Sequence, residues 1–339
     1  MEDYVAALLK EASLAPIADC QTLYVGGGTP SLLPLSLLEK LMRGLEKNFG
    51  PVSKFFESTI EGNPESLTPE KLNFLKEAGF NRLSIGLQSF NDSELKTLGR
   101  IHTQADFLRA YKNARAAGFQ NINVDLIAGL PGQTLQSFLE GLQALLALEP
   151  EHLSVYGLQI EEGTPFFERG IVCDQLLMRR MLEETRARLT AAGFHHYEIS
   201  NFVRPGFESK HNMHYWQYGQ YIGLGSAAAS FMDGVRRQNT PNIADYVARM
   251  NASQSPVVFQ EALQGQALEG EKLLLALRQL DGVEPTEKQL SFFAKEIEKH
   301  IKNGLLERTG KKVKLTQEGL FLANEVFCSF VAPFEDACK

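Results

Sequence analysis

The sequence predicts an α/β fold with a parallel sheet, either open or closed into a barrel. Over roughly the first two-thirds of the chain, short apolar runs alternate with longer amphipathic runs. Several of the longer runs end in Ala-Gly, which is typical of a helix that stops at a glycine before the next strand. Regular alternation of strands and helices indicates βα units and hence parallel strand pairing.

The individual elements follow from residue type and spacing. Short runs of β-branched, aromatic and apolar residues predict buried strands, and longer runs with apolar residues three or four apart predict helices. The strands are expected at 23–25, 58–62, 82–87, 122–127, 152–158 and 197–200, and the helices at 32–45, 68–78, 104–117, 134–148 and 175–192.

Three consecutive glycines, 26–28, follow the first predicted strand in the stretch YVGGGTPSLL. Glycines let backbone N–H groups approach a ligand without a Cβ in the way, and Thr29 adds a hydroxyl group. A tight turn from strand to helix also needs glycine for steric reasons alone. The loop by itself therefore does not separate a ligand site from a turn.

Polar residues follow the next four predicted strands as well. Each lies at or just past the carboxyl end of its strand, and in a βα barrel the loops at that end converge over one mouth. Five such loops in succession favour a ligand site over chance polarity. The residues are Glu61 and Asn63 after the second strand, Gln88 after the third, Asp125 and Gly129 after the fourth, and Gln159 and Glu161 after the fifth.

Composition excludes several classes of protein. With 339 residues, 44% hydrophobic and 22% charged, the chain can bury a sizeable core, and we expect one large and one small domain. A net charge of −7 without a long Lys/Arg run argues against nucleic acid as a partner. No apolar stretch reaches the length of an integral membrane segment, and the N-terminus lacks signal-peptide character, so we expect a cytoplasmic location.

The cysteines indicate no metal site within this chain. Cys20, Cys173, Cys328 and Cys338 are scattered, and no two have the spacing of zinc or iron–sulfur ligands. Since disulfides are rare in the cytosol, we expect isolated buried or surface thiols.

A series of ordered motifs gives the chain a family resemblance. From about Tyr4 to about Phe330 it resembles the HemW-type haem chaperones, relatives of the oxygen-independent coproporphyrinogen III oxidases in the radical S-adenosylmethionine (radical SAM) superfamily. The motifs are YVGGGTPSLL, IEGNPESLTPEKL, EAGFNRLSIGLQSFND, LGRIHT, NINVDLIAGLPGQT, YGLQIEEGTPF, YEISNFVRPG and HNMHYW. The resemblance implies a partial (β/α)6 TIM-like barrel with its first strand missing, plus a small winged-helix-like C-terminal domain.

The resemblance also implies that S-adenosylmethionine is the ligand at the barrel rim. Its carboxylate, amine, ribose diol and sulfonium call for backbone donors, carboxylate acceptors and an arginine in one pocket. Two alternatives stay open: a structural ion pair between Arg100 and Asp125, and a Gln88 that only satisfies loop backbone groups. The implied residues are Gly27, Gly28 and Thr29 of the GGTP loop, with Glu61, Gln88, Arg100 and Asp125 in the later motifs.

The main departure from the family concerns its [4Fe–4S] cluster. Radical enzymes of the superfamily hold this cluster with a C-x3-C-x2-C loop that precedes the segment matching Tyr4, so the cluster cysteines are expected upstream of Met1. The chain as given lacks the motif and is not expected to be catalytically competent by itself. Two explanations remain: an upstream start, which an uncovered sheet edge favours, or a naturally shortened form.

The stretch HNMHYW matches the family's haem-associated HNxxYW motif through His211, Asn212, Tyr215 and Trp216. Imidazole is a usual axial ligand of haem iron, and flat aromatic side chains favour a porphyrin face. His214 falls at a variable position of the motif. The alternative is a loop packed back on the barrel, with His211 hydrogen-bonded and Trp216 in the core.

These features predict a HemW-like haem chaperone on a radical SAM scaffold, which binds haem and delivers it to a haem-accepting apoprotein. We allow for a homodimer. The alternative function is that of an oxygen-independent coproporphyrinogen III oxidase, which forms protoporphyrinogen IX by oxidative decarboxylation.

The expected domains are a partial barrel at 1–205, a connecting region with the haem-associated motif at 206–265, and a helical winged-helix-like domain at 266–339. The last domain begins with an acidic segment, so packing or partner docking is favoured over DNA binding.

Overall fold

The computed structural model describes residues 1–16 and 19–332, so Cys338 lies outside the described residues. The chain forms two compact units. We call residues 20–42 and 50–209 the sheet unit, and the described parts of 1–19, 43–49 and 210–339 the terminal unit. The N-terminal helix therefore folds with the last third of the chain and not with the sheet that follows it in sequence.

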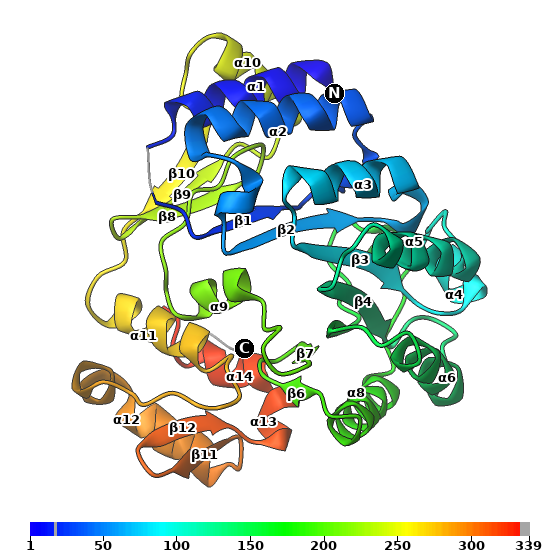
Figure 1. Ribbon diagram of the computed structural model, residues 1–339. Helices are drawn as coiled ribbons and strands as arrows, with labels where there is room; N and C mark the ends of the chain where they lie inside the picture. Colours follow the sequence, from blue (N-terminus) through cyan, green and yellow to red (C-terminus); the bar gives the residue numbers. More distant parts are fainter. Residues whose placement is uncertain (17–18, 333–339) are drawn as a thin grey trace. The chain divides into compact units, whose positions relative to one another are not determined.

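A seven-stranded sheet forms the centre of the sheet unit (Figure 1). Its order is β1-β2-β3-β4-β5-β7-β6; the first five strands pair in parallel, and β7 is antiparallel to both neighbours. This pairing confirms a mostly parallel α/β sheet. The strands are β1 Thr22–Val25, β2 Glu57–Gly62, β3 Arg82–Gln88, β4 Ile122–Ala128, β5 His152–Gly157, β6 His195–His196 and β7 Asn201–Val203.

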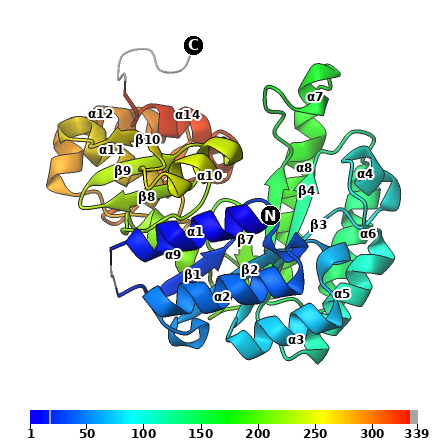
Figure 2. The same ribbon diagram turned by 90° about the horizontal axis from the view of Figure 1, so that it is seen from above.

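Helices connect the parallel strands, and α3, α5, α6 and α8 lie along one side of the sheet (Figures 1 and 2). Three of them begin at a threonine whose side chain accepts a backbone N–H three residues later: Thr68, Thr103 and Thr134. The helices are α2 Leu35–Phe49, α3 Pro69–Ala78, α4 Asp92–Thr97, α5 Gln104–Ala116, α6 Leu135–Leu146, α7 Pro165–Glu168 and α8 Gln175–Ala191.

The two faces of the sheet differ in chemistry. Side chains alternate across a strand, so residues two apart share a face. The face toward the helices carries the apolar core residues Ile60, Leu83, Ile85, Leu87, Val124, Leu126, Leu153 and Val155. The opposite face carries Tyr24, Glu57, Thr59, Glu61, Arg82, Ser84, Gln88, Asn123, Asp125, His152 and Ser154. A parallel sheet buried between apolar layers would have apolar residues on both faces, so this polar face indicates a functional interior.

The strand expected at 197–200 is wrong. That segment turns the chain between β6 and β7, where Glu198 accepts the Ser200 backbone N–H at 2.8 Å through Oε1. The apolar and aromatic residues there signalled a strand, but the glutamate side chain stabilises a turn instead. Regular βα alternation accordingly ends after β5.

The terminal unit combines helices with two small antiparallel sheets. A three-stranded sheet has the order β10-β9-β8, and a two-stranded sheet pairs β11 with β12. The elements are α1 Glu2–Leu14, α9 Lys210–Trp216, β8 Ala229–Met232, β9 Val235–Asn239, α10 Ile243–Asn251, β10 Val257–Glu261, α11 Gly265–Ala276, α12 Glu287–Lys302, β11 Leu306–Thr309, β12 Lys312–Leu315, α13 Gln317–Phe321 and α14 Ala323–Cys328.

Glu11 holds α1 within the terminal unit. Its carboxylate accepts hydrogen bonds from the Gly225 backbone N–H at 2.7 Å, from Asn239 Nδ2 at 2.6 Å and from the Tyr246 hydroxyl at 2.6 Å. Three donors from three separate segments satisfy one half-buried carboxylate, which fixes α1 against α10 and β9.

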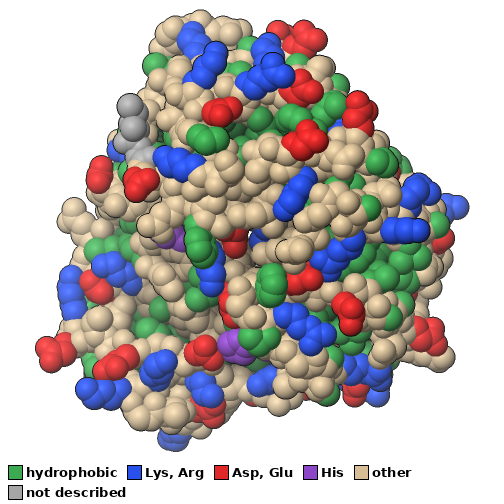
Figure 3. Space-filling model, in the orientation of Figure 1, with side chains coloured by type: hydrophobic (Ala, Val, Ile, Leu, Met, Phe, Trp, Pro, Cys, Tyr) green, Lys and Arg blue, Asp and Glu red, His purple; other side chains and the backbone are tan. Residues whose placement is uncertain are grey.

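Basic and acidic side chains are interspersed on the face of the molecule that Figure 3 shows, in keeping with the modest net charge of −7. No helix of the described residues is long and apolar enough to cross a membrane. The partial barrel and the winged-helix assignment, which specify more than the strand order does, stay predictions.

Candidate functional site

Two of the three glycines after β1 are required, each for a different reason. A Cβ on Gly26 would lie 2.6 Å from Tyr24 Cε1 and 2.8 Å from Glu61 Cδ, so packing demands glycine there. Gly27 has a φ of +99°, which only glycine adopts readily. Neither reason applies to Gly28, whose Cβ would meet nothing within 4 Å. The turn therefore explains Gly26 and Gly27, and Gly28 adjoins open space where a ligand can approach the backbone.

Thr29, the last residue of this loop, has a left-handed backbone with φ 58° and ψ 78° before a short 3₁₀ turn at Pro30–Leu32. A β-branched residue rarely adopts this conformation, which costs about 1–3 kcal/mol. Strain of this size persists only where surrounding structure maintains it, and such positions cluster at ligand sites.

Glu61 at the end of β2 ties the glycine loop to the sheet. Its Oε1 accepts the Tyr24 hydroxyl at 2.7 Å, and its Oε2 accepts the Gly27 backbone N–H at 3.1 Å. Burial, followed by the Glu61 charge, raises the pKa of Tyr24 above its usual value, so the phenol stays protonated and donates. The Glu61 carboxylate is thereby held at the mouth of the β1 loop.

Gln88, Asn63 and Arg100 form a second group. A β-bulge between Gly86 and Gln88 gives Gln88 a φ of +72°, and a Cβ on Gly86 would lie 2.9 Å from Gln88 Nε2 and 3.4 Å from Asn63 Oδ1. Arg100 Nη1 donates to Asn63 Oδ1 at 3.3 Å. The bulge therefore turns the Gln88 amide back over Gly86, beside the arginine.

Asp125 lies on β4 opposite Gly86 of β3, so it faces this second group. Asn123 Nδ2 donates to Asp125 Oδ1 at 2.8 Å. Desolvation raises the pKa of Asp125 to about 6, against the lowering effect of hydrogen bonds from Asn123 and Ser154. The alternative ion pair with Arg100 does not form among the described residues, because Arg100 binds Asn63 and Asp125 binds Asn123.

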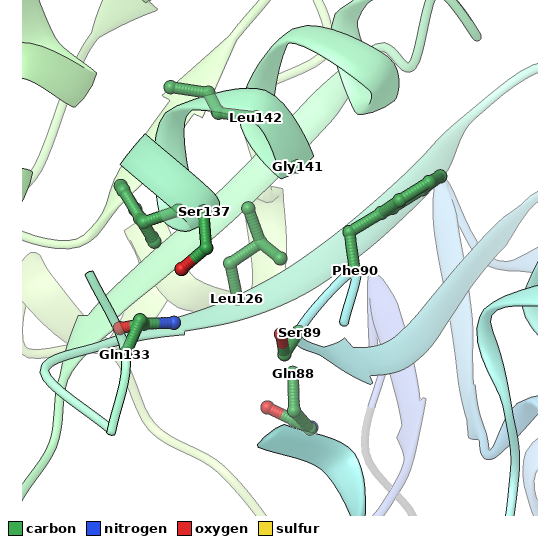
Figure 4. A pocket seen from close by; sticks show the side chains of 9 residues that line it. Gln88, Ser89, Phe90, Leu126, Gln133, Ser137, Gly141 and Leu142 are labelled. Carbon is green, nitrogen blue, oxygen red and sulfur yellow. The ribbon is translucent and has the colours of Figure 1, made fainter. Parts of the chain in front are cut away.

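A buried carboxylate supports two of these loops. Glu94 accepts the Ser89 hydroxyl at 2.5 Å, Gln133 Nε2 at 2.8 Å and the Ser137 hydroxyl at 2.9 Å. Gln133 in turn accepts the backbone N–H of Gly129 at 2.8 Å. Figure 4 shows Ser89, Gln133 and Ser137 around a small pocket of about 10 Å³, room for about one water molecule. Glu94 thus joins the loop after β3, which begins at Ser89, to the loop after β4.

Taken together, the expected rim residues fit S-adenosylmethionine. Glu61 and Asp125 supply acceptors, Arg100 supplies a guanidinium, and Gly28 leaves the backbone open. Sequence reasoning missed Tyr24, Asn123 and His152, and noted Asn63 only for its position. The signal that could have identified Asn123 is its i, i+2 spacing from Asp125, which places the two side chains on the same face of a strand.

The haem-associated motif forms the helix α9 and divides between two of its faces. His211 Nε2 lies 2.8 Å from the Tyr215 hydroxyl, and the two rings pack edge to face with centroids 4.8 Å apart. Trp216 lies under the Arg278 guanidinium at 4.2 Å, and its buried indole N–H has no hydrogen-bond acceptor. His214 binds the Gln220 carbonyl at 2.7 Å instead. His211 is therefore hydrogen-bonded, as the alternative interpretation expected, but within a helix.

Aromatic rings continue from Tyr215 away from α9. Tyr215 packs on Tyr221 at 4.7 Å, Tyr218 packs on Phe231 at 4.7 Å, and Tyr221 lies 6.4 Å from Phe231. We call Tyr215, Tyr218, Tyr221 and Phe231 the aromatic cluster. Together with the His211 imidazole it offers flat apolar rings beside a nitrogen ligand, which suits a porphyrin.

The described residues do not fit an iron–sulfur cluster. Within 1–16 and 19–332, no group of three or more His, Cys, Asp or Glu side chains could hold a metal ion. Cys173, for example, donates to the Leu158 carbonyl at 3.6 Å.

Comparison with known proteins first gives the class. The family model of the Radical SAM superfamily matches residues 2–145. The solved structure of coproporphyrinogen III oxidase (HemN) from Escherichia coli, described as a radical SAM enzyme, matches with a TM-score of 0.85 over 98% of this chain and 83% of that chain. At 24% identity this likeness shows the fold alone. The match to the family model and the fold define the class as that of the radical SAM proteins.

Sequence relatives then give the family. The heme chaperone HemW of Bacillus subtilis is 37% identical over 92% of this chain and 86% of its own length. The heme chaperone HemW of Lactococcus lactis is 32% identical over 98% and 90%, and that of Escherichia coli is 35% identical over 86% and 73%. The chain belongs to the heme chaperone HemW family.

Proposed function

We propose that this protein is a haem chaperone that binds haem beside α9 and delivers it to a haem-accepting apoprotein. The observation that carries the proposal is the contact between His211 and Tyr215, next to the aromatic cluster, in a chain whose relatives are heme chaperones. Imidazole and phenolate are both known ligands of haem iron. Binding through Nε2 requires His211 to leave the Tyr215 hydroxyl, so haem and Tyr215 compete for the same nitrogen.

We further propose that S-adenosylmethionine binds at the carboxyl ends of β1 to β4, within a partial radical SAM barrel. Gly27, Gly28 and Thr29 would contact its methionine part, and Glu61, Gln88, Arg100 and Asp125 would hold its charged and hydroxyl groups. In this superfamily S-adenosylmethionine supplies a 5′-deoxyadenosyl radical when a reduced cluster accompanies it. The residues of this chain would bind and orient S-adenosylmethionine.

The test of haem binding is a titration with haemin followed by the Soret absorbance. The His211→Ala variant is expected to bind at least tenfold more weakly, and Trp216→Ala to weaken binding less, because its ring packs on Arg278 rather than on the aromatic cluster. His214→Ala is the matched control: the same residue type on the same helix, bound to Gln220. Unchanged affinity in a His211→Ala, Trp216→Ala double variant contradicts the site.

The oxidase alternative receives no specific support from the described residues, because the likeness to coproporphyrinogen III oxidase extends to the fold alone. Incubating the purified protein with coproporphyrinogen III and S-adenosylmethionine under reducing, anaerobic conditions checks it. We expect no protoporphyrinogen IX alongside stoichiometric haem binding.

A further inference from the structure

A chain of buried hydrogen bonds crosses the polar face of the sheet from Ser209 to Asp125. The Ser209 backbone N–H lies 3.3 Å from the Tyr197 hydroxyl, which lies 2.8 Å from His152 Nε2. His152 Nδ1 lies 2.6 Å from Asn123 Oδ1, and Asn123 Nδ2 lies 2.8 Å from Asp125 Oδ1. Ser209 and His152 are 0% exposed, and Asn123 and Tyr197 are 3% and 4% exposed. Water therefore cannot substitute for a lost link without a rearrangement.

The donor and acceptor of every hydrogen bond in this series follow from the groups at its two ends, because each of these groups can play only one role. A backbone N–H can only donate, so the Ser209 amide obliges the Tyr197 oxygen to accept and directs the Tyr197 proton toward His152. At the other end an ionised carboxylate can only accept, so the nitrogen of the Asn123 amide must face Asp125 and its oxygen must face His152. Nδ1 of His152 then carries the proton and Nε2 accepts.

The environment of His152 agrees with this assignment. Burial, with a smaller contribution from Arg82, holds the pKa of His152 well below its usual value, so the ring is neutral and has one donor and one acceptor nitrogen. Asn123 makes two further contacts: Nδ2 with the Ser84 hydroxyl at 2.8 Å, and Oδ1 with the Ser154 hydroxyl at 3.0 Å. The Asn123 amide therefore uses its full hydrogen-bonding capacity in one orientation.

We propose that Asn123, His152 and Tyr197 are positioning residues for the cofactor site. Tyr197 and His152 hold the Asn123 amide in the orientation that donates to Asp125. Asp125 thereby remains an ionised acceptor that faces the ribose hydroxyls or the ammonium group of S-adenosylmethionine. The inference rests on the proposed cofactor site. None of the three residues contacts the cofactor in this assignment; each acts through Asp125.

Several other groups act on the Asp125 carboxyl. Glu61 on β2 raises its pKa, and Arg82 on β3 and Ser154 on β5 lower it. The hydroxyls of Tyr24 on β1 and Tyr156 on β5 also interact with its charge, and burial raises the pKa of each above the usual value. These neighbours remain in the variants below, so a change in Asp125 titration reports the loss of the Asn123 donor.

The experiment is a carboxyl ¹³C NMR titration of the full chain labelled at aspartate, with the Asp125 signal identified by its loss in Asp125→Asn. We expect the Asp125 midpoint to rise by roughly half a pH unit to one unit in Asn123→Ala, because a donor to the charged form is lost. Tyr197→Phe, which keeps the ring and removes one link, is expected to cause a smaller rise. Tyr111→Phe is the control, because Tyr111 donates to the Leu148 carbonyl at 3.0 Å and takes no part in the hydrogen bonds between Ser209 and Asp125.

S-adenosylmethionine affinity is measured on the same variants by calorimetry between pH 5 and 8. The pH at which affinity is half lost should rise together with the NMR midpoint. An unmoved Asp125 midpoint in both Asn123→Ala and Tyr197→Phe overturns the inference. If the melting temperature falls while the midpoint stays unmoved, these residues have a purely structural role. If the wild-type chain binds no S-adenosylmethionine while the NMR midpoint moves, the cofactor assignment fails and the link to Asp125 stands.

Discussion

The Gly27 backbone N–H donates to Glu61 Oε2 at 3.1 Å, so a carboxylate on β2 holds the loop that follows β1. The same carboxylate accepts the Tyr24 hydroxyl on its other oxygen. Because Glu61 already has two donors, it shapes the loop before any ligand arrives.

Replacing Glu61 by Gln should weaken S-adenosylmethionine binding by roughly 10- to 100-fold, because one of two acceptor oxygens becomes a donor and a charge is lost. Calorimetric titration checks this. Glu77→Gln, an exposed change on α3, is the control and should bind as the wild type does. Equal affinities in the two variants would remove Glu61 from the site.

Alanine at two neighbouring glycines should have opposite effects. Gly26→Ala places a Cβ within 3 Å of Tyr24 and Glu61 and should cost about 1–3 kcal/mol of stability. Gly28→Ala meets open space, so its melting temperature should match the wild type while S-adenosylmethionine affinity falls. Thermal unfolding and calorimetry on both variants separate the two outcomes; a stable Gly28→Ala that binds normally contradicts a ligand at this loop.

Asp125 should make the protein less stable as pH rises. Its native pKa of about 6 exceeds the ordinary value of 3.8, so between these values the native state holds a proton that the unfolded chain has released. This contribution is complete below pH 3.8 and is lost as pH rises through 6. Asp125→Asn should therefore raise the free energy of unfolding by up to about 3 kcal/mol at pH 8 and change it little at pH 3.5. Urea unfolding at both pH values measures this, with the exposed Asp233→Asn as the control.

Loss of the Glu94 carboxylate should loosen both loops that it joins. Glu94→Gln replaces one of the two acceptor oxygens by an amide donor that faces the donors of Ser89, Gln133 or Ser137 and removes the charge that strengthens these bonds, at a cost of about 1–3 kcal/mol. The exposed Glu140→Gln on α6 should be neutral. Denaturant midpoints provide the comparison, and hydrogen exchange at Gln88 and Gly129 should quicken only in the first variant.

Glu11→Ala should destabilise the terminal unit by about 2–4 kcal/mol, because Gly225, Asn239 and Tyr246 all lose their acceptor. Glu2→Ala, in the first turn of the same helix, should cost less than about 1 kcal/mol. A calorimetric melt that shows equal losses for both variants would mean that Glu11 does not anchor α1.

Sequence periodicity predicted β1 to β5 and the helices α2, α3, α5, α6 and α8, because each has a local signal: β-branched and apolar strand residues, apolar residues three or four apart in the helices, and Ala-Gly at several helix ends. The short helices α4 and α7 were not predicted. The hairpin of β6 and β7 lacked such a signal, since the Glu198 side chain and pairing with β5 decide it. Within the site, the alternating polar residues of β3 and β4 were visible in the sequence, but the bulge that turns Gln88 was not. Likewise the i, i+4 spacing of His211 and Tyr215 fits a helix, yet only the fold shows that they bind each other.

The Ser209 amide offers a built-in isotopic reporter. It is the last residue before α9, it is fully buried, and its hydrogen bond ends on Tyr197. Deuterium can reach this one nitrogen only when the first link of the chain to Asp125 opens, so its exchange rate counts those openings directly. This exchange rate can be measured with haem, with S-adenosylmethionine and with both. A change would show that the bound ligand alters the hydrogen bond between Ser209 and Tyr197.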